Sequence, residues 1–251
     1  MPWQLETPVS AIIFDCDGTL SSIEGVDELA RHNGVYHQVQ TLTAAAMGSI
    51  GINPALYEQR LELIRPTQEQ VHALGQEYFI HQTVDAHAII QLLQRLKKTI
   101  YIVSAGVYPA VLKFGQLLQV PAENIFAVKV FFDTQKKYLD YDHHSPLIHN
   151  QGKQEIVAQI KLKHPKLIYI GDGLNDLSVY DLVTRFVGYG GAYYRENIAE
   201  RCQYYIQMPT MAPLLPLVLT RQEQKKLLLP EQAIYQRGLE AIKRGEVKGA
   251  R

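Results

Sequence analysis

The sequence has little cysteine and no hydrophobic run long enough to cross a bilayer. Its two cysteines, Cys16 and Cys202, lie far apart and fit no disulfide or metal-ligand spacing. This excludes a secreted disulfide scaffold and suits a reducing cytosol, so we expect a cytoplasmic protein. The longest apolar stretch, Met208–Leu219, holds three prolines and is too short for a membrane span. The opening, MPWQLETPVS, lacks the features of a signal peptide.

The sequence also lacks a charge imbalance, because 25 Lys and Arg residues balance 25 Asp and Glu residues. A neutral chain without a basic block is not typical of a nucleic-acid-binding protein, so we expect neither a nucleic acid nor a membrane as partner. With 47% apolar residues in 251, the chain can bury a full core as one large domain or two small ones. The oligomeric state, monomer or homodimer, is left open.

Short apolar runs followed by helical patterns predict buried parallel strands. The expected strands are Val9–Phe14, Ile100–Ser104, Leu167–Gly171 and Arg185–Tyr189. Between the first two, the spacing predicts helices over Gly25–His32, Tyr36–Met47, Pro54–Ile64, Gln68–Phe79 and Ala86–Lys97. A crossover between parallel strands needs one helix, so five indicate an inserted cap. Val128–Phe132 and Lys137–Tyr141 predict an exposed hairpin.

The expected fold is therefore α/β, an open Rossmann-like parallel sheet with helices on both faces and a small helical cap inserted after the first strand. We assign residues 1–20 and 99–207 to the core, 21–98 to the cap, and 208–251 to a C-terminal tail. Gln222–Arg251 is polar and basic, and we expect a solvated helix there.

The most specific motif is Asp15-Cys16-Asp17-Gly18-Thr19-Leu20, which follows an apolar strand. Ligands of open α/β sheets bind beyond the carboxyl ends of the strands, where these acids lie. Two carboxylates at one site repel each other unless a cation lies between them. The alternative is a turn with solvated acids, which an Asp-x-Asp pair alone would fit equally well.

A second motif, Gly171-Asp172-Gly173-Leu174-Asn175-Asp176, follows another apolar strand, with a helix expected from Leu177. Its Asp and Asn residues could instead be simple helix caps. Ser104-Ala105-Gly106 closes the second strand before a helix expected from Val107, and a hydroxyl beside helix amides can hold an anion. Lys153 begins a helix expected over Gly152–Lys161.

Together these segments indicate a site for phosphoryl transfer. The carboxylates would hold Mg²⁺, which prefers oxygen ligands, while Ser104, Lys153 and backbone amides would hold anionic oxygens. Neither Cys16 nor the His143, His144 and His149 group indicates a further site. The flanking acids raise the thiol pKa of Cys16, and the histidines lack convergent ligand spacing.

The four motifs, in this order, resemble the haloacid dehalogenase superfamily of hydrolases. Further segments resemble phosphoserine phosphatases, and the resemblance runs from about Ala11 to Ile206. These segments are Ser22–Ala30, Ala46-Met47-Gly48, Arg60–Ile64 and Gly190–Arg195. The resemblance implies a Mg²⁺-dependent hydrolase that acts on a small phosphomonoester.

The same resemblance implies roles for individual residues. Asp15 would be the nucleophile that forms an aspartyl-phosphate, and Asp17 the general acid and base. Mg²⁺ would bind Asp15, the backbone carbonyl of Asp17, and Asp172, with Asp176 in or beside that set. The phosphoryl group would be held by Ser104, the amide of Ala105, Lys153 and Asn175.

Glu24 and Arg60 suggest which substrate the cap recognises. A carboxylate can pair with an ammonium and a guanidinium with a carboxylate, so the two can recognise a zwitterion such as L-phosphoserine. The resemblance places them at the amino- and carboxylate-recognising positions, although both could be ordinary helix residues. Asn53 replaces an aromatic residue usual in the family, and Ala105 replaces a glycine.

Two alternative functions remain open. One is the same chemistry on phosphoethanolamine, a sugar phosphate or a nucleotide phosphate. The other is a non-catalytic, receiver-like phosphate-binding protein, against which Asp17 argues because a pure phosphoacceptor needs no acid for a leaving group.

Overall fold

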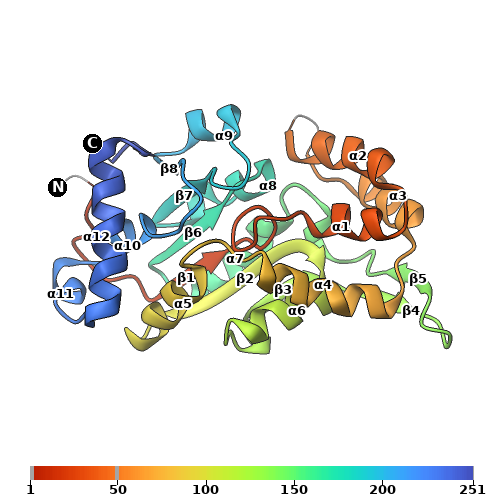
Figure 1. Ribbon diagram of the computed structural model, residues 1–251, viewed down its shortest axis with the longest axis horizontal. Helices are drawn as coiled ribbons and strands as arrows, with labels where there is room; N and C mark the ends of the chain where they lie inside the picture. Colours follow the sequence, from red (N-terminus) through yellow and green to blue (C-terminus); the bar gives the residue numbers. More distant parts are fainter. Residues whose placement is uncertain (1–2, 49–50, 251) are drawn as a thin grey trace.

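The computed structural model describes residues 3–48 and 51–250, and a seven-stranded sheet forms its centre (Figure 1). The strand order is β3-β2-β1-β6-β7-β8-β9, and every neighbouring pair is parallel except β8 with β9. The strands of this sheet are β1 (Ala11–Phe14), β2 (Thr99–Val107), β3 (Ile125–Val128), β6 (Leu167–Gly171), β7 (Arg185–Tyr189), β8 (Tyr204–Ile206) and β9 (Val247–Lys248). Strands β1, β6 and β7 are buried along their whole length, as expected for a parallel sheet with helices packed around it.

The predicted α/β fold is confirmed, with differences at strand ends. Leu167–Gly171 and Arg185–Tyr189 are strands as predicted, whereas the first strand begins at Ala11 and the second continues to Val107. The hairpin forms a separate sheet of β4 (Val130–Phe132) and β5 (Tyr138–Tyr141). Val128, predicted as part of the hairpin, instead ends β3. Two apolar runs separated only by Lys129 serve two different sheets here, and alternating hydropathy does not show which sheet each run joins.

In the described part of the segment between β1 and β2 there are five helices, as predicted. They are α1 (Gly25–His32), α2 (Tyr36–Gly48), α3 (Pro54–Ile64), α4 (Gln68–Ile80) and α5 (Ala86–Arg95). Asn53 caps α3 by accepting a 3.0 Å hydrogen bond from the Leu56 amide, and Thr67 caps α4 in a capping box with Gln70. The last helix ends at Arg95, before the predicted Lys97, because Lys97 adopts a left-handed φ of 64° that ends the helix.

The remaining helices lie between the later strands. They are α6 (Tyr108–Leu117), α7 (Gly152–Lys163), α8 (Leu174–Leu177) and α9 (Glu196–Arg201), with 3₁₀ turns η1 (Ala122–Asn124), η2 (Pro146–Ile148) and η3 (Tyr180–Leu182). The helix predicted from Leu177 is wrong, because α8 is a single turn that ends there. The helix predicted from Val107 begins one residue later, since β2 includes Val107.

The tail is more than the solvated helix that its composition predicts. It forms α10 (Leu214–Val218), α11 (Arg221–Gln224) and α12 (Leu229–Arg244) before β9 joins the sheet edge antiparallel to β8. Every residue of α10 is buried, while Lys225, Lys226 and Lys243 are exposed as expected. Blue α10–α12 lie at one end of the molecule and orange α1–α3 at the other (Figure 1). No helix in the described ranges is long and apolar enough to cross a membrane.

The sheet order determines where the predicted motifs meet. Strand β1 lies between β2 and β6 and is parallel to both, so the carboxyl ends of all three strands reach the same edge. Asp15 follows β1, Asp172 follows β6, and Ser104 lies in the last part of β2. The sequence motifs therefore converge at one edge of the sheet.

Candidate active site

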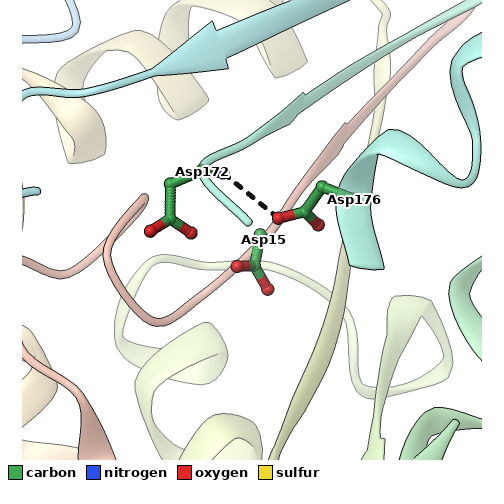
Figure 2. A group of neighbouring side chains, drawn as sticks. All are labelled: Asp15, Asp172 and Asp176. Carbon is green, nitrogen blue, oxygen red and sulfur yellow. Dashed lines mark hydrogen bonds between the residues drawn. The ribbon is translucent and has the colours of Figure 1, made fainter. Parts of the chain in front are cut away.

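Three buried carboxylates form the centre of this edge (Figure 2). Asp15, Asp172 and Asp176 each offer an oxygen within 4.8 Å of the others. The Asp15 amide donates a 2.9 Å hydrogen bond to the Ile170 carbonyl, which fixes the end of β1 beside the end of β6. The two acidic motifs, about 155 residues apart, thus become one cluster of like charge.

The ammonium of Lys153 lies against this cluster from the first turn of α7. Its Nζ donates 2.6 Å hydrogen bonds to Oδ1 of Asp15 and to Oδ1 of Asp176, and the side chain is almost fully buried. Burial alone would lower the Lys153 pKa, but the two carboxylates outweigh it and raise that pKa. Burial and Asp176 in turn raise the Asp15 pKa against the attraction of Lys153.

Asp176 is saturated with hydrogen-bond donors. Besides Lys153, its Oδ1 accepts a 2.6 Å bond from the Tyr169 hydroxyl, and its Oδ2 accepts the amides of Asp172 and Gly173 at 3.1 and 2.9 Å. Four donors leave this carboxylate suited to fixing the Asp172 loop and the Lys153 ammonium. Direct metal ligation by Asp176 is therefore less favoured than ligation by Asp15 and Asp172.

The carboxylate oxygens of the cluster that accept no hydrogen bond are suited to bind a hard cation. Asp172 Oδ1 is buried and has no hydrogen-bond partner among the described residues. Burial raises the pKa of Asp172 to about 6, although Arg195 opposes that rise. An unpartnered buried carboxylate oxygen is costly, and a divalent cation with oxygen ligands would remove that cost. The residues present thus fit Mg²⁺.

Gly18 allows the first motif to approach Asp172 closely. Its φ is +68°, a left-handed conformation that glycine adopts without strain, and a Cβ there would lie 2.5 Å from Asp172 Oδ2. A larger residue would therefore separate the Asp15–Asp17 loop from Asp172.

Asp17 joins the last part of β2 to the inserted helices through its two carboxylate oxygens. Its Oδ2 accepts a 3.2 Å hydrogen bond from the Ser104 hydroxyl, and Ser104 Oγ in turn accepts the Gly106 amide at 2.8 Å. Its Oδ1 accepts the Gly25 amide at 2.7 Å and the Tyr78 hydroxyl at 2.6 Å. No sequence motif predicts this contact of Tyr78, because a tyrosine on a predicted helix carries no local signal of function.

One cavity gathers most of the predicted site residues from both the sheet edge and the inserted helices. It is lined by Asp15, Asp17, Glu24, Val26, Ala46, Ile52, Arg60, Ala105, Gly106, Lys153 and Asn175. A larger groove of about 480 Å³ lies between the N-terminal segment and α11, and no predicted site residue lines it. The chemistry therefore belongs to the smaller cavity.

Glu24 and Arg60 bring opposite charges to the wall of this cavity. Arg60 is 5% exposed, and its Nε has no hydrogen-bond partner among the described residues. Burial lowers the pKa of Arg60 below its ordinary value, against Tyr57 and Glu24. Burial raises the pKa of Glu24, and Asp17 and Asp172 raise it further against Arg195.

Arg195 links Glu24 to the acidic cluster. Its Nη2 lies 3.0 Å from Asp172 Oδ2 and 3.5 Å from Glu24 Oε1, and its Nε also donates to Asp172 Oδ2 at 3.2 Å. Arg195 ends the Gly190–Arg195 segment, and no role for it is predicted from the sequence. Its three contacts make it the cation that balances Asp172 in this structure.

Comparisons with known proteins agree with this geometry. Residues 9–179 match the model of the haloacid dehalogenase-like hydrolase family. The chain is 31% identical to phosphoserine phosphatase of Bos taurus over 78% of this chain and 88% of that protein, and 32% identical to the Homo sapiens protein over the same shares.

Solved structures show the same fold. A substrate-bound phosphoserine phosphatase complex superimposes with a TM-score of 0.75 at 23% identity, covering 85% of this chain and all of that one. A phosphoserine phosphohydrolase-like protein from Francisella tularensis gives 0.75 at 22% identity, covering 84% of this chain and all of that one. The chain therefore belongs to the haloacid dehalogenase-like hydrolase family and is a phosphomonoester hydrolase of the phosphoserine phosphatase-like branch.

Proposed function

We propose that the protein hydrolyses L-phosphoserine to L-serine and phosphate through an aspartyl-phosphate on Asp15. The observation that carries the substrate is Arg60, a buried guanidinium without a hydrogen-bond partner at Nε, on the wall of the cavity that holds Asp15. A buried cation with an unused donor costs free energy unless a ligand supplies an anion. The names of the similar proteins point to the same substrate.

In the first half-reaction, Asp15 attacks the phosphorus atom. Lys153 holds Oδ1 of Asp15 at 2.6 Å, which leaves Oδ2 for the new O–P bond. As the ester P–O bond breaks, Asp17 gives a proton to the departing oxygen, and serine leaves as a neutral alcohol. Asp15 then carries the phosphoryl group.

In the second half-reaction, water attacks the phosphorus of the aspartyl-phosphate. Asp17, now ionised, accepts a proton from that water, and the bond between phosphorus and Asp15 breaks to release phosphate and restore the carboxylate. Ser104, the Ala105 amide, Lys153 and Asn175 would hold the phosphoryl oxygens throughout. Lys153 offsets the repulsion between a carboxylate and a phosphate dianion.

Mg²⁺ would be held by Asp15, Asp172 and the backbone carbonyl of Asp17. Bound there, it supplies positive charge that lets the nucleophile approach the phosphate. Asp176, which receives four hydrogen bonds, would orient Lys153 and the Asp172 loop.

The substrate's two remaining charges would be read by Glu24 and Arg60. Glu24 pairs with the ammonium, and Arg60 pairs with the carboxylate. Asn53 stands where an aromatic residue is usual in the family, and it caps the helix that carries Arg60. We also propose a division of the chain into a core (1–20 and 99–207), a cap (21–98) and a tail (208–251).

The test is phosphate release with Mg²⁺ from L-phosphoserine, phosphoethanolamine, a sugar phosphate, a nucleotide and p-nitrophenyl phosphate. We expect L-phosphoserine to give the highest kcat/KM. Arg60→Ala should lower that value on the order of a hundredfold, because a buried charge-assisted pair is lost, and should change p-nitrophenyl phosphate hydrolysis far less. Gln59→Ala, an exposed neighbour on α3, serves as the control.

Two outcomes would redirect the proposal. Faster turnover of phosphoethanolamine, a sugar phosphate or a nucleotide, with Arg60→Ala nearly neutral, would keep the chemistry and reject L-phosphoserine. Failure to hydrolyse any of the esters would favour the receiver-like alternative.

A further inference from the structure

The Tyr78 hydroxyl contacts the carboxylate proposed as the general acid and base. Its Oη donates a 2.6 Å hydrogen bond to Oδ1 of Asp17, across 61 residues of sequence. Tyr78 is fully buried on α4, within the inserted helices, whereas Asp17 belongs to the loop after β1. A hydrogen bond of this length to a carboxylate is among the stronger kinds in proteins.

The donors around Asp17 separate its two oxygens into different environments. Oδ1 accepts from both Tyr78 and the Gly25 amide, at 2.6 and 2.7 Å. Oδ2 accepts from Ser104, at the longer distance of 3.2 Å. Since Ser104 is proposed to hold the phosphoryl group, Oδ2 is the oxygen that faces the reacting atoms. Oδ1 is anchored on the side of the inserted helices.

The phenol ring of Tyr78 is held in place by its surroundings. It stacks on Phe114 of α6 with ring centroids 5.6 Å apart and planes at 28°. A Cβ at Gly25 would lie 1.9 Å from the Tyr78 oxygen, so the glycine makes room for the hydroxyl. The stacked ring and the space beside Gly25 together fix the direction in which the hydroxyl donates to Asp17.

We propose that Tyr78 is a positioning residue for Asp17. Its hydrogen bond fixes Oδ1 so that Oδ2 transfers the proton to and from the reacting oxygens. This inference rests on the proposed function, because it assigns to Asp17 the proton that serine needs in order to leave. The Tyr78 proton itself stays on the phenol oxygen in both half-reactions.

The role predicts a dependence on the leaving group. When the ester bond of phosphoserine breaks, the departing alkoxide must take a proton from Asp17 Oδ2. p-Nitrophenolate is a stable anion and departs without one. Displacement of the Asp17 carboxylate should therefore slow the hydrolysis of phosphoserine more than the hydrolysis of p-nitrophenyl phosphate. A general loss of structure would slow both alike.

The experiment compares Tyr78→Phe with the wild type, using kcat/KM for both esters with Mg²⁺. This parameter covers the steps up to departure of the leaving group. Tyr78→Phe keeps the ring that stacks on Phe114 and removes only the hydroxyl. We expect the ratio of kcat/KM for phosphoserine to kcat/KM for p-nitrophenyl phosphate to fall about tenfold, the scale of one lost charge-assisted hydrogen bond.

Two further variants sharpen the comparison. Asp17→Asn should lower the same ratio, and adding Tyr78→Phe to Asp17→Asn should lower it no further, since the two residues act through one proton transfer. Tyr101→Phe removes a different half-buried hydroxyl, 3.2 Å from His164 Nε2, and should leave the ratio unchanged.

The outcomes distinguish this inference from the proposed function. One contrary result is that Tyr78→Phe lowers kcat/KM equally for both substrates, and another is that it lowers the ratio as much in the Asp17→Asn background as in the wild type. Either result would mean that Tyr78 has a structural role and that the inference is wrong. If Asp17→Asn itself leaves the ratio unchanged, the proposed mechanism fails together with the inference.

Discussion

The Lys153 ammonium lies 2.6 Å from Asp15 Oδ1, at the point where α7 meets the end of β1. The pair is almost completely buried, and Asp176 holds the same ammonium from the other side at 2.6 Å. A nucleophilic carboxylate must approach a phosphate of like charge, so a fixed cation beside it lowers the barrier to attack. The same contact leaves one Asp15 oxygen oriented for reaction.

The first prediction concerns this carboxylate. Asp15→Asn should reduce phosphate release by at least about a thousandfold, because the amide is a far weaker nucleophile and cannot form the covalent intermediate. Activity with Mg²⁺ and L-phosphoserine is the measurement. Cys16→Ala is the adjacent control and should retain turnover, since burial and the flanking acids raise the thiol pKa and keep it protonated. Substantial Mg²⁺-dependent activity in Asp15→Asn would contradict the mechanism.

The acidic cluster predicts that Mg²⁺ stabilises the folded protein. Added Mg²⁺ at a hundredfold excess over its Kd should raise the free energy of unfolding by about 2.7 kcal/mol. The melting temperature should therefore rise by several degrees for a chain of this size. Asp172→Asn should remove most of the shift, because Asp172 Oδ1 is the buried oxygen without a described partner. Asp181→Asn, an exposed acid on η3, should keep it. A shift of equal size in Asp172→Asn would place the cation elsewhere.

Glu24 should make the ligand-free protein less stable as pH rises. Burial raises its folded pKa above the ordinary 4.5, so the folded state keeps a proton that the unfolded state releases. Stability is therefore lost as pH increases from about 4.5 through the folded pKa. Glu24→Gln carries no such charge. In EDTA, the melting temperature of Glu24→Gln should exceed that of the wild type increasingly as pH rises through that range. The difference should be roughly 2–4 °C for each kcal/mol of unfolding free energy that the wild type loses.

The comparison variant for this prediction is Glu28→Gln, on α1 just after Glu24 and less buried. It should track the wild type at every pH. A Glu24→Gln melting curve parallel to wild type from acid to neutral pH would mean that Arg195 fully compensates the buried charge. Phosphoserine hydrolysis by Glu24→Gln should fall even where stability rises, because the site carries this cost in order to bind an ammonium.

Much of the fold and the candidate site could be predicted from sequence because the signals are local. A buried run followed by Asp15 and Asp17, or by Asp172 and Asp176, marks a strand end in a few residues. Parallel order then brings such ends together. The hydroxyl of Tyr78 could not be found in this way, because its contact with Asp17 depends on how α4 packs, 61 residues away.

The tail is largely helical as predicted, but its final strand differs from the prediction for a similar physical reason. β9 is two residues long, and its pairing with β8 is a non-local contact without a periodic signal. The basic residues of this segment that the structure describes are exposed, as predicted. The buried acid Glu223, however, reads in the sequence like any surface glutamate.

Glu223 should contribute strongly to the stability of the whole protein. Its Oε1 lies 2.6 Å from Lys98 Nζ, with the Lys98 side chain only 1% exposed, and its Oε2 accepts the Thr220 amide at 2.8 Å. Glu223→Gln would leave a buried ammonium without its counter-charge, at a cost of about 3–5 kcal/mol. Its denaturant midpoint should therefore fall well below that of Glu62→Gln, which removes only the exposed pair with Arg65.

The double change Lys98→Met with Glu223→Gln removes the uncompensated charge and should recover part of the loss. If Glu223→Gln unfolds at the wild-type midpoint, the other contacts of the tail, such as the buried α10 and the pairing of β9 with β8, hold it without the ion pair. A restored midpoint in the double variant would show that the loss in Glu223→Gln came from the uncompensated Lys98 ammonium, and that the ion pair itself adds little net stability.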